Sequence, residues 1–120
     1  MRGAKKPTAA ELEHMGRCRD GPCIPCIVRL RAGHLSEDEV FVGVSYDHKK
    51  SGNIRRGHLY GFASCAWHHF GHPLPAHLPG PNTYGPSLMD GSRLFRETYG
   101  SDDELIELQR RILEGEPWEG

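Results

Sequence analysis

The sequence predicts a small α+β domain that folds as one unit over residues 1–120 and needs a stabilising cross-link such as a disulfide or a bound metal. Helix-capping signals lie near both ends of the chain, and two segments between them have the composition of strands. The chain contains 15 Gly and 9 Pro, and its mean hydropathy is −0.60. A chain of this length and composition buries only a modest core, so a disulfide or a bound metal usually supplies the missing stability.

The first expected element is a short amphipathic helix over residues 8–16. Thr8 and Glu11 have the spacing of a capping box, in which each residue satisfies a backbone group of the other. Gly16 is the expected end of this helix. The glycine and prolines of the next segment, DGPCIPC at residues 20–26, predict a turn rather than a helix.

Residues 23–72 are expected to form the core of the domain. The segment EVFVGVSY, residues 39–46, has the apolar and β-branched content of a strand, and Gly43 within it indicates a bulge or a close backbone approach. A second short strand is expected near residues 58–63, after a polar loop. The octet CAWHHFGH, residues 65–72, has room for only a short helix before its glycine and the proline that follows.

The rest of the chain predicts a loop followed by helices. Prolines and glycines recur through residues 73–92, which therefore predict an extended loop. Residues 93–114 predict a helical segment interrupted at Gly100. Its second helix begins at Ser101 as N-cap, with acidic residues in the first turn and basic residues in the last. An apolar face consists of Leu105, Ile106, Leu108 and Ile112.

Composition limits the classes of function. The formal net charge is −1, so contact with nucleic acid would need a local basic patch rather than a global basic field. No stretch approaches the roughly 18 apolar residues of a spanning helix, and the first residues lack the apolar run of a signal peptide. We therefore expect a cytoplasmic protein without a membrane partner, in which the 4 cysteines are thiols or metal ligands.

Two ligand pairs predict a structural zinc site. Cys23-x2-Cys26 and Cys65-x2-His68 each place two ligands on one tight turn, and together they supply the four tetrahedral ligands that zinc prefers. Such a site is closed, so its role is structural. One alternative is a redox CxxC, which favours a βαβ context that is absent from this sequence. Cys18 could replace one ligand, or it could be a spare thiol.

A second group of polar residues follows the first expected strand. Asp47 and His48 are neighbours, so an extended backbone directs their side chains to opposite faces. One can then bind a metal while the other holds a water molecule. Along the chain these two residues are followed by an expected loop and short strand, by His58 and by the Cys-x2-His pair, and His69 comes directly after that pair.

This series of residues resembles a known nuclease finger. The segment YDHKKSGNIRRGHLYGFASCAWHH, residues 46–69, looks like the ββα-metal (HNH, His-Me) finger. Within that superfamily it is most similar to the phage and prophage Ref family of RecA-dependent recombination-enhancement nucleases. The resemblance extends to PTAAELEHMGRC at residues 7–18, to CIPC at residues 23–26, and to YGPSLMDGSRLFRETYGSDDELIELQRRIL at residues 84–113. It implies a zinc-stapled ββα-metal fold with flanking helices.

The resemblance also implies a role for each polar residue of the finger. Asp47 matches a ligand of the catalytic ion, and His48 matches the general base that deprotonates the attacking water. His58 stands at the middle position of the pattern, where Asn is common, and would shape the loop or orient the base. His69 matches the final histidine, a second ligand of the catalytic ion. His72 could share a helical face with His69 and act as a further ligand.

These residue types suit the hydrolysis of a phosphodiester bond. A neutral imidazole, with an ordinary pKa of about 6.5, serves as a base at working pH. One divalent ion stabilises the charge on the phosphate and on the leaving oxygen. Asp and His ligands suit Mg²⁺ or Mn²⁺, with Zn²⁺ as an alternative. The expected DNA contacts come from a local basic patch after the base, formed by Lys49, Lys50, Arg55 and Arg56.

The primary hypothesis is therefore a metal-dependent DNA endonuclease. The resemblance implies a recombination role in a bacterial host, on single-stranded DNA or a displacement loop, together with a RecA-type recombinase filament. The rival hypothesis is a non-catalytic zinc module that binds DNA or protein with the same scaffold. A second metal site at Asp47 and His69, with His48 beside it, would distinguish the two.

Overall fold

The computed structural model describes residues 6–51, 54–55 and 57–120, and for residues 50–51 and 54–55 only the backbone. Six α-helices are labelled in chain order: α1 Ala9–Asp20, α2 Ile24–Arg31, α3 Ala66–Phe70, α4 Pro81–Tyr84, α5 Ser92–Tyr99 and α6 Asp102–Leu113. Four short strands form two antiparallel pairs: β1 Ser45–His48 with β4 Gly61–Ser64, and β2 Lys50–Ser51 with β3 Ile54–Arg55. Two 3₁₀ turns, Glu37–Glu39 and Leu88–Asp90, complete the described elements.

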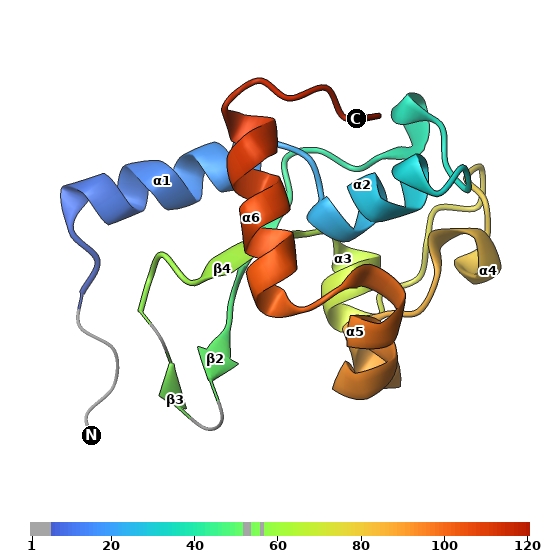
Figure 1. Ribbon diagram of the computed structural model, residues 1–120. Coiled ribbons are helices and arrows are strands. Elements are labelled where there is room, and N and C mark those ends of the chain that lie inside the picture. Colours follow the sequence, from blue (N-terminus) through green and yellow to red (C-terminus); the bar gives the residue numbers. More distant parts are fainter. Residues whose placement is uncertain (1–5, 52–53, 56) are drawn as a thin grey trace.

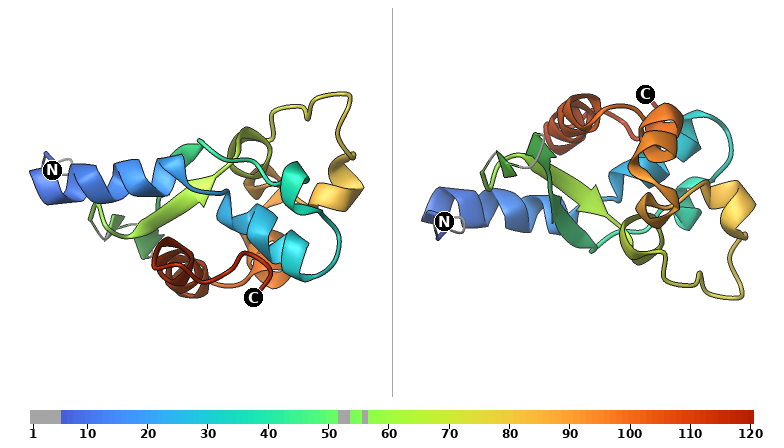
Figure 2. Two further views of the ribbon diagram at one scale, coloured as in Figure 1. Left: turned by 90° about the horizontal axis from the view of Figure 1, so that it is seen from above. Right: turned by 90° about the horizontal axis from the view of Figure 1, so that it is seen from below.

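The β1–β4 pair lies between helical layers. Helix α6 packs on β4, and α1 and α2 contact the same strand (Figure 1). Figure 2 shows α6 on one side of the strand pair and the connection from α3 to α4 on the other. This arrangement confirms the predicted α+β class. None of the described helices is long and apolar enough to cross a membrane.

Helix α1 begins as predicted but ends later. Thr8 and Glu11 form the capping box, with Glu11 N donating to Thr8 Oγ1 at 3.1 Å and Thr8 N to Glu11 Oε1 at 2.8 Å. The predicted end at Gly16 is wrong, because the helix continues through it. Interior glycine costs about 1 kcal/mol in a helix. The burial of Met15 and Cys18 against the strand pair outweighs that cost.

The turn predicted over residues 20–26 is also wrong in part. Helix α2 begins inside it, with Cys23 as N-cap and Pro25 in the first turn. Proline is tolerated there because the first backbone N–H groups of a helix have no partner within the helix. Ile24 and Ile27 are fully buried, so tertiary packing holds the short helix in place.

The strands lie further along the chain than predicted. Of residues 39–46 only the last two belong to β1, because Gly43 has a φ of +67° and interrupts the extended backbone. The β1–β4 register places Asp47 opposite Phe62 and His48 opposite Gly61. A Cβ atom at Gly61 would lie 2.4 Å from the Asp47 carbonyl oxygen, so only glycine permits this close pairing. The position of Asp47 and His48 therefore depends on this register.

The C-terminal elements follow the prediction closely. Helix α5 ends before Gly100, and Ser101 caps α6 in a capping box with Glu104. The apolar face of α6 is buried at Leu105, Leu108 and Ile112, and Ile106 is half-buried. The loop over residues 73–92 is interrupted by α4 and by the turn at residues 88–90.

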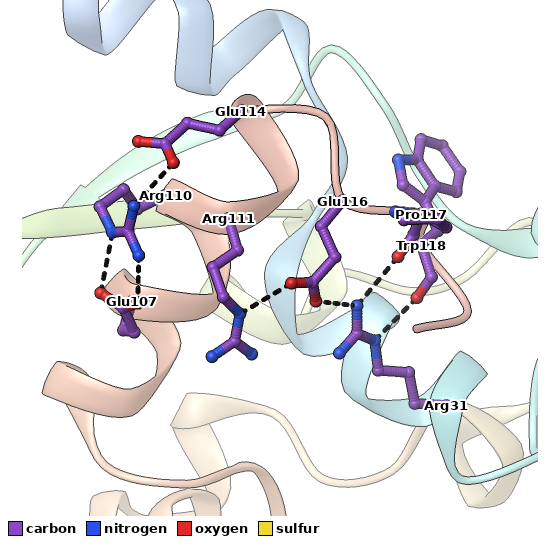
Figure 3. A network of polar contacts seen from close by, with 8 residues as sticks. All are labelled: Arg31, Glu107, Arg110, Arg111, Glu114, Glu116, Pro117 and Trp118. Carbon is purple, nitrogen blue, oxygen red and sulfur yellow. Dashed lines mark hydrogen bonds and ion pairs between the residues drawn. The ribbon is translucent and has the colours of Figure 1, made fainter.

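The segment after α6 is held by arginines (Figure 3). Arg31 of α2 donates to the carbonyl oxygens of Pro117 and Trp118 and to the Glu116 carboxylate, at 2.8–2.9 Å. Arg111 forms a second ion pair with Glu116 at 3.2 Å. Trp118 is thereby held against the core.

One polar residue in the core was not predicted. Gln109 of α6 is buried and its amide spans the backbone of β4: Ala63 N donates to Gln109 Oε1 at 2.9 Å, and Gln109 Nε2 donates to the Gly61 carbonyl at 3.1 Å. Helix α6 therefore provides hydrogen-bond partners for backbone groups at the edge of β4, the strand that pairs with the segment containing Asp47 and His48.

We expect Gln109→Leu to lower the free energy of unfolding by about 2 kcal/mol or more, because both β4 groups lose their partner while buried. Chemical denaturation measures this loss. Glu107→Leu, an exposed change on the same helix, is the control and should cost less than about 1 kcal/mol. Equal effects of the two changes would contradict the role of Gln109.

Candidate functional site

Four predicted metal ligands form one compact buried group. The ligand atoms of Cys23, Cys26, Cys65 and His68 all lie within 4.8 Å of one another. His68 Nδ1 is 3.4, 3.6 and 3.2 Å from the sulfurs of Cys23, Cys26 and Cys65, respectively. Zinc–ligand bonds of about 2.0–2.3 Å in a tetrahedron place nitrogen and sulfur about 3.5 Å apart. The spacing therefore fits a closed zinc site.

Two helix starts bring these ligands together. Cys23 is the N-cap of α2, and Cys26 lies one turn later. Cys65 is the N-cap of α3, where its sulfur accepts the backbone N–H of His68 at 3.4 Å. Thiolates are stabilised at such positions because the first N–H groups of a helix point toward them.

A second contact fixes the orientation of His68. Its Nε2 lies 2.8 Å from the carbonyl oxygen of Tyr84, which can accept only from a protonated Nε2. Nδ1 is then left with a free lone pair that faces the three sulfurs. A histidine that binds metal through one nitrogen commonly donates from the other to a carbonyl in this way.

The protonation of the thiols also suits a bound cation. Burial raises the pKa values of Cys23 and Cys26 well above their ordinary range, whereas the neighbouring thiols and His68 lower the pKa of Cys65. A divalent ion would stabilise all three as thiolates. All of the thiols are buried, which does not suit the alternative of a redox CxxC, since exchange needs an accessible thiolate.

Cys18 lies outside this group. It packs with Met15, Tyr46 and Ala63 in a separate cluster, and its sulfur is 3.5 Å from His14 Nε2. Of the two possibilities that the sequence left open, the structure therefore favours the spare thiol.

Cys18 should react slowly with iodoacetamide in the zinc-loaded protein. Burial raises the pKa of its thiol to about 11, although Arg17 and Arg19 lower it in part. Because only the thiolate reacts, the alkylation rate should increase about tenfold per pH unit between about pH 8 and about pH 10. Mass spectrometry of the modified peptide measures the rate. A rate that levels off near the ordinary thiol pKa of about 8.5 would contradict this assignment.

The first and last polar residues of the predicted finger meet beside this group of three cysteines and one histidine. Asp47 projects from β1 and His69 from α3, and His69 Nε2 lies 3.3 Å from Asp47 Oδ1. Two ligands on one octahedral ion of Mg²⁺ size are about 3 Å apart. The two atoms are therefore close to the separation that a shared ion requires.

Asp47 is held as a carboxylate. It is 7% exposed. Burial alone would raise its pKa, but the hydrogen bond with His69 and the Lys49 ammonium outweigh burial, so that the pKa lies below its ordinary value. An ionised carboxylate is the form that binds a metal.

His48 and His58 form a second pair. His48 Nε2 lies 3.3 Å from His58 Nδ1, and the rings cross nearly at right angles. One nitrogen of this contact carries the hydrogen, so His58 can select the tautomer of His48. Tyr46 supports the pair: its hydroxyl donates to the His58 carbonyl at 2.8 Å, and its ring packs edge-on against His48.

Lys49 does not extend into solvent. Its side chain is buried, and Nζ lies 2.6 Å from Asp47 Oδ2. The backbone of the other expected DNA-contact residues Lys50 and Arg55 lies in the β2–β3 pair, directly after β1, whereas Arg56 lies outside the described residues.

A cleft of about 310 Å³ opens beside Asp47 and His48. Asp47, His48 and Lys49 form one wall of the cleft. The other wall comes from α5, from the start of α6 and from the turn before α5, and its residues are Leu88, Ser92, Phe95, Arg96 and Asp102. None of these five was predicted as a site residue, because nothing in their local sequence indicates that they face β1.

The other histidines lie apart from the paired residues. His72 and His77 are exposed, and among the described residues the Cys23–Cys26–Cys65–His68 group alone gathers three or more metal-binding side chains. A third protein ligand at His72 stays a prediction. Trp67, between Cys65 and His68, packs against the core and donates to the Gly85 carbonyl at 2.9 Å.

Comparison with known proteins gives one match. A family model described as "Recombination enhancement, RecA-dependent nuclease" matches residues 7–114, which include both metal-binding pairs and the cleft. No curated protein and no solved structure gives a significant match.

Proposed function

The chain belongs to the recombination-enhancement, RecA-dependent nuclease family, and from that premise we propose that it is a metal-dependent DNA endonuclease with a ββα-metal (HNH) active site. The family description indicates a nuclease, and hence a hydrolase, that works in recombination together with RecA. The observation that carries the finer proposal is the contact between Asp47 on β1 and His69 on α3, 3.3 Å apart beside the His48–His58 pair.

In this proposal Asp47 Oδ1 and His69 Nε2 hold one divalent ion. When bound, Mg²⁺ or Mn²⁺ supplies charge stabilisation at the phosphate and the leaving oxygen. The two side chains fit such an ion because one is a buried carboxylate and the other an imidazole whose nitrogen faces it. Further ligands would come from water and the phosphate, as is usual for Mg²⁺.

His48 is the general base. It lines the same cleft as Asp47, so both side chains can reach one phosphate in that cleft, although neighbouring strand positions direct the two side chains to opposite faces. His58 holds the imidazole through its Nδ1 and sets which nitrogen of His48 takes the proton of the attacking water. Their proposed roles differ: His48 accepts the proton, and His58 orients the His48 ring.

The zinc site proposed at Cys23, Cys26, Cys65 and His68 supports the proposed catalytic site through the backbone. His68 binds zinc and His69, the next residue, points to Asp47, so the rigid zinc group fixes the backbone of a catalytic ligand. Asp47 itself is fixed by the close β1–β4 pairing at Gly61. A site held by rigid elements keeps the geometry that catalysis needs.

The DNA is expected to cross the cleft from the β2–β3 pair to α5. Lys50, Arg55 and Arg56 belong to the chain segment that leaves β1 at the proposed base, and Arg96 lies on the opposite wall of the cleft. Basic residues on both sides would hold phosphates next to the one that is cleaved. Single-stranded DNA, alone or in a displacement loop within a recombinase filament, is the proposed substrate.

Incision of circular single-stranded DNA and of displacement loops, with and without a RecA filament, tests the function. Wild type should incise DNA in Mg²⁺ or Mn²⁺ and not in chelator. Asp47→Asn should lose at least about a hundredfold in rate because the ion loses its carboxylate. Asp20→Asn, an exposed change, is the control. Equal background cleavage by wild type and Asp47→Asn in every condition would favour the non-catalytic zinc module instead.

A further inference from the structure

The buried lysine of the cleft is unusual for its residue type. Lys49 is 8% exposed, and lysine is almost never buried unless it is paired. Its Nζ lies 2.6 Å from Asp47 Oδ2, and it lies 4.8 Å and 5.7 Å from the ring centroids of Phe62 and Phe95. Two aromatic rings and the Asp47 carboxylate therefore lie beside its charge, and the Asp102 carboxylate of the opposite wall is near enough to interact with it electrostatically.

The two oxygens of Asp47 have different partners. Oδ2 faces the Lys49 ammonium, and Oδ1 faces His69 Nε2 at 3.3 Å. A carboxylate held in this way on one oxygen cannot rotate freely. The oxygen that remains for a metal is then Oδ1, which is the one beside the second proposed ligand.

The position of Lys49 argues against two simpler roles. A lysine that binds the phosphate backbone as a flexible point charge extends into solvent, whereas this side chain lies against Phe62 and Phe95. An ion pair that only stabilises the core would lie away from the cleft, whereas Lys49 lines it together with Asp47 and His48.

We propose that Lys49 is a positioning residue of the metal centre: it neutralises Asp47 in the metal-free protein and holds Oδ2, so that Oδ1 and His69 Nε2 receive the divalent ion. The inference rests on the metal site of the proposed function. It assigns to Lys49 a role within the centre in place of the phosphate contact expected from the sequence.

This arrangement has a measurable consequence. In the metal-free protein the ammonium compensates a buried carboxylate, which would otherwise be costly. In the metal-loaded protein the ammonium and the ion share one carboxylate and repel each other. Lys49 therefore stabilises the empty centre and weakens the binding of the ion.

Titration of the zinc-loaded protein with Mn²⁺, followed by electron paramagnetic resonance, tests the proposal together with thermal unfolding. Lys49→Met should lower the melting temperature of the Mn²⁺-free protein and tighten Mn²⁺ binding at least about tenfold. Lys49→Arg should keep Mn²⁺ affinity within about threefold of wild type, because the charge is kept. Lys6→Met, which removes an exposed lysine, is the matched control and should change neither quantity.

The double variant Lys49→Met/Asp47→Asn separates charge from packing. It should recover most of the melting temperature lost in Lys49→Met, because the buried Asp47 carboxylate is no longer left without its partner, and it should no longer bind Mn²⁺ at this site. If Lys49→Met is unfolded without Mn²⁺, the proposal requires Mn²⁺ to restore its folded signal. Unchanged or weaker Mn²⁺ binding in Lys49→Met, or no refolding with Mn²⁺, overturns the proposal.

Failure of this inference is distinguishable from failure of the proposed function. A wild-type protein that incises DNA but shows unchanged Mn²⁺ affinity in Lys49→Met keeps the function and loses the role of Lys49. Mn²⁺ binding that tightens as expected, in a protein without any incision activity, keeps the role of Lys49 at a metal site and loses the nuclease proposal.

Discussion

Replacement of Cys65 by serine is expected to unfold the protein or to lower its melting temperature by more than about 15 °C. Cys65 closes the group of four buried ligands, at 3.2 Å from His68 Nδ1. Structural zinc contributes about 10–16 kcal/mol to the folding of small zinc domains, whereas the net stability of a domain is only about 5–15 kcal/mol. The loss of one ligand can therefore remove most of the stability.

The measurement combines zinc content, from mass spectrometry of the metal, with thermal unfolding followed by circular dichroism. Cys18→Ser is the matched control, since Cys18 is an equally buried thiol outside the metal-binding group. It should keep one equivalent of zinc and cost about 1–3 kcal/mol for a buried hydroxyl. A Cys65→Ser protein that binds one zinc ion and melts with wild type would contradict a structural zinc site at these four residues.

Replacement of His48 by alanine is expected to lower the rate of DNA incision by about 10²–10⁴-fold, the usual contribution of general base catalysis. The side chain lines the cleft beside Asp47, and no other histidine among the described residues shares both that cleft and that neighbour. The loss should appear in kcat rather than in DNA affinity, because in the proposed role the imidazole acts on the water and not on the substrate backbone.

His58 should behave differently, because its proposed role is to orient His48. His58→Asn retains a short side chain with a hydrogen-bonding amide, so the incision rate should stay within about tenfold of wild type. His58→Ala removes the contact of 3.3 Å with His48 Nε2 and should cost more than the Asn variant. His34→Ala, an exposed histidine, is the control. Equal rates for His58→Asn and His58→Ala would contradict an orienting hydrogen bond.

The predicted elements that were confirmed depend on short-range signals. The capping boxes at Thr8 and Ser101 and the termination of α5 at Gly100 each involve residues within one helical turn. The two-residue gaps within the metal-binding pairs are equally local. For that reason the sequence alone could identify the four ligands that the structure brings together.

The elements that were wrong depend on packing. The sequence placed a turn where α2 begins, because Pro25 disfavours a helix in general, whereas Ile24 and Ile27 are buried in the folded chain. The first strand was placed too early, because its apolar residues resemble a strand although Gly43 interrupts it. Local composition could not indicate which of these residues would find a partner strand.

The sequence by itself therefore determined the residue types of the proposed chemistry, their spacing, the start of α1, the end of α5 and the start of α6, since each of these acts over a few neighbouring residues. Only the tertiary structure decided that Asp47 meets His69, that Lys49 turns inward to Asp47, and that α5 closes the cleft. The Asp47–His69 contact and the α5 wall join segments far apart in the chain. Lys49 turns inward because the rings of Phe62 and Phe95, from other elements, lie beside its ammonium. These contacts exist because burial of the apolar faces of α2 and α6 against β4, with α5 packed on α2, stabilises one arrangement of those segments.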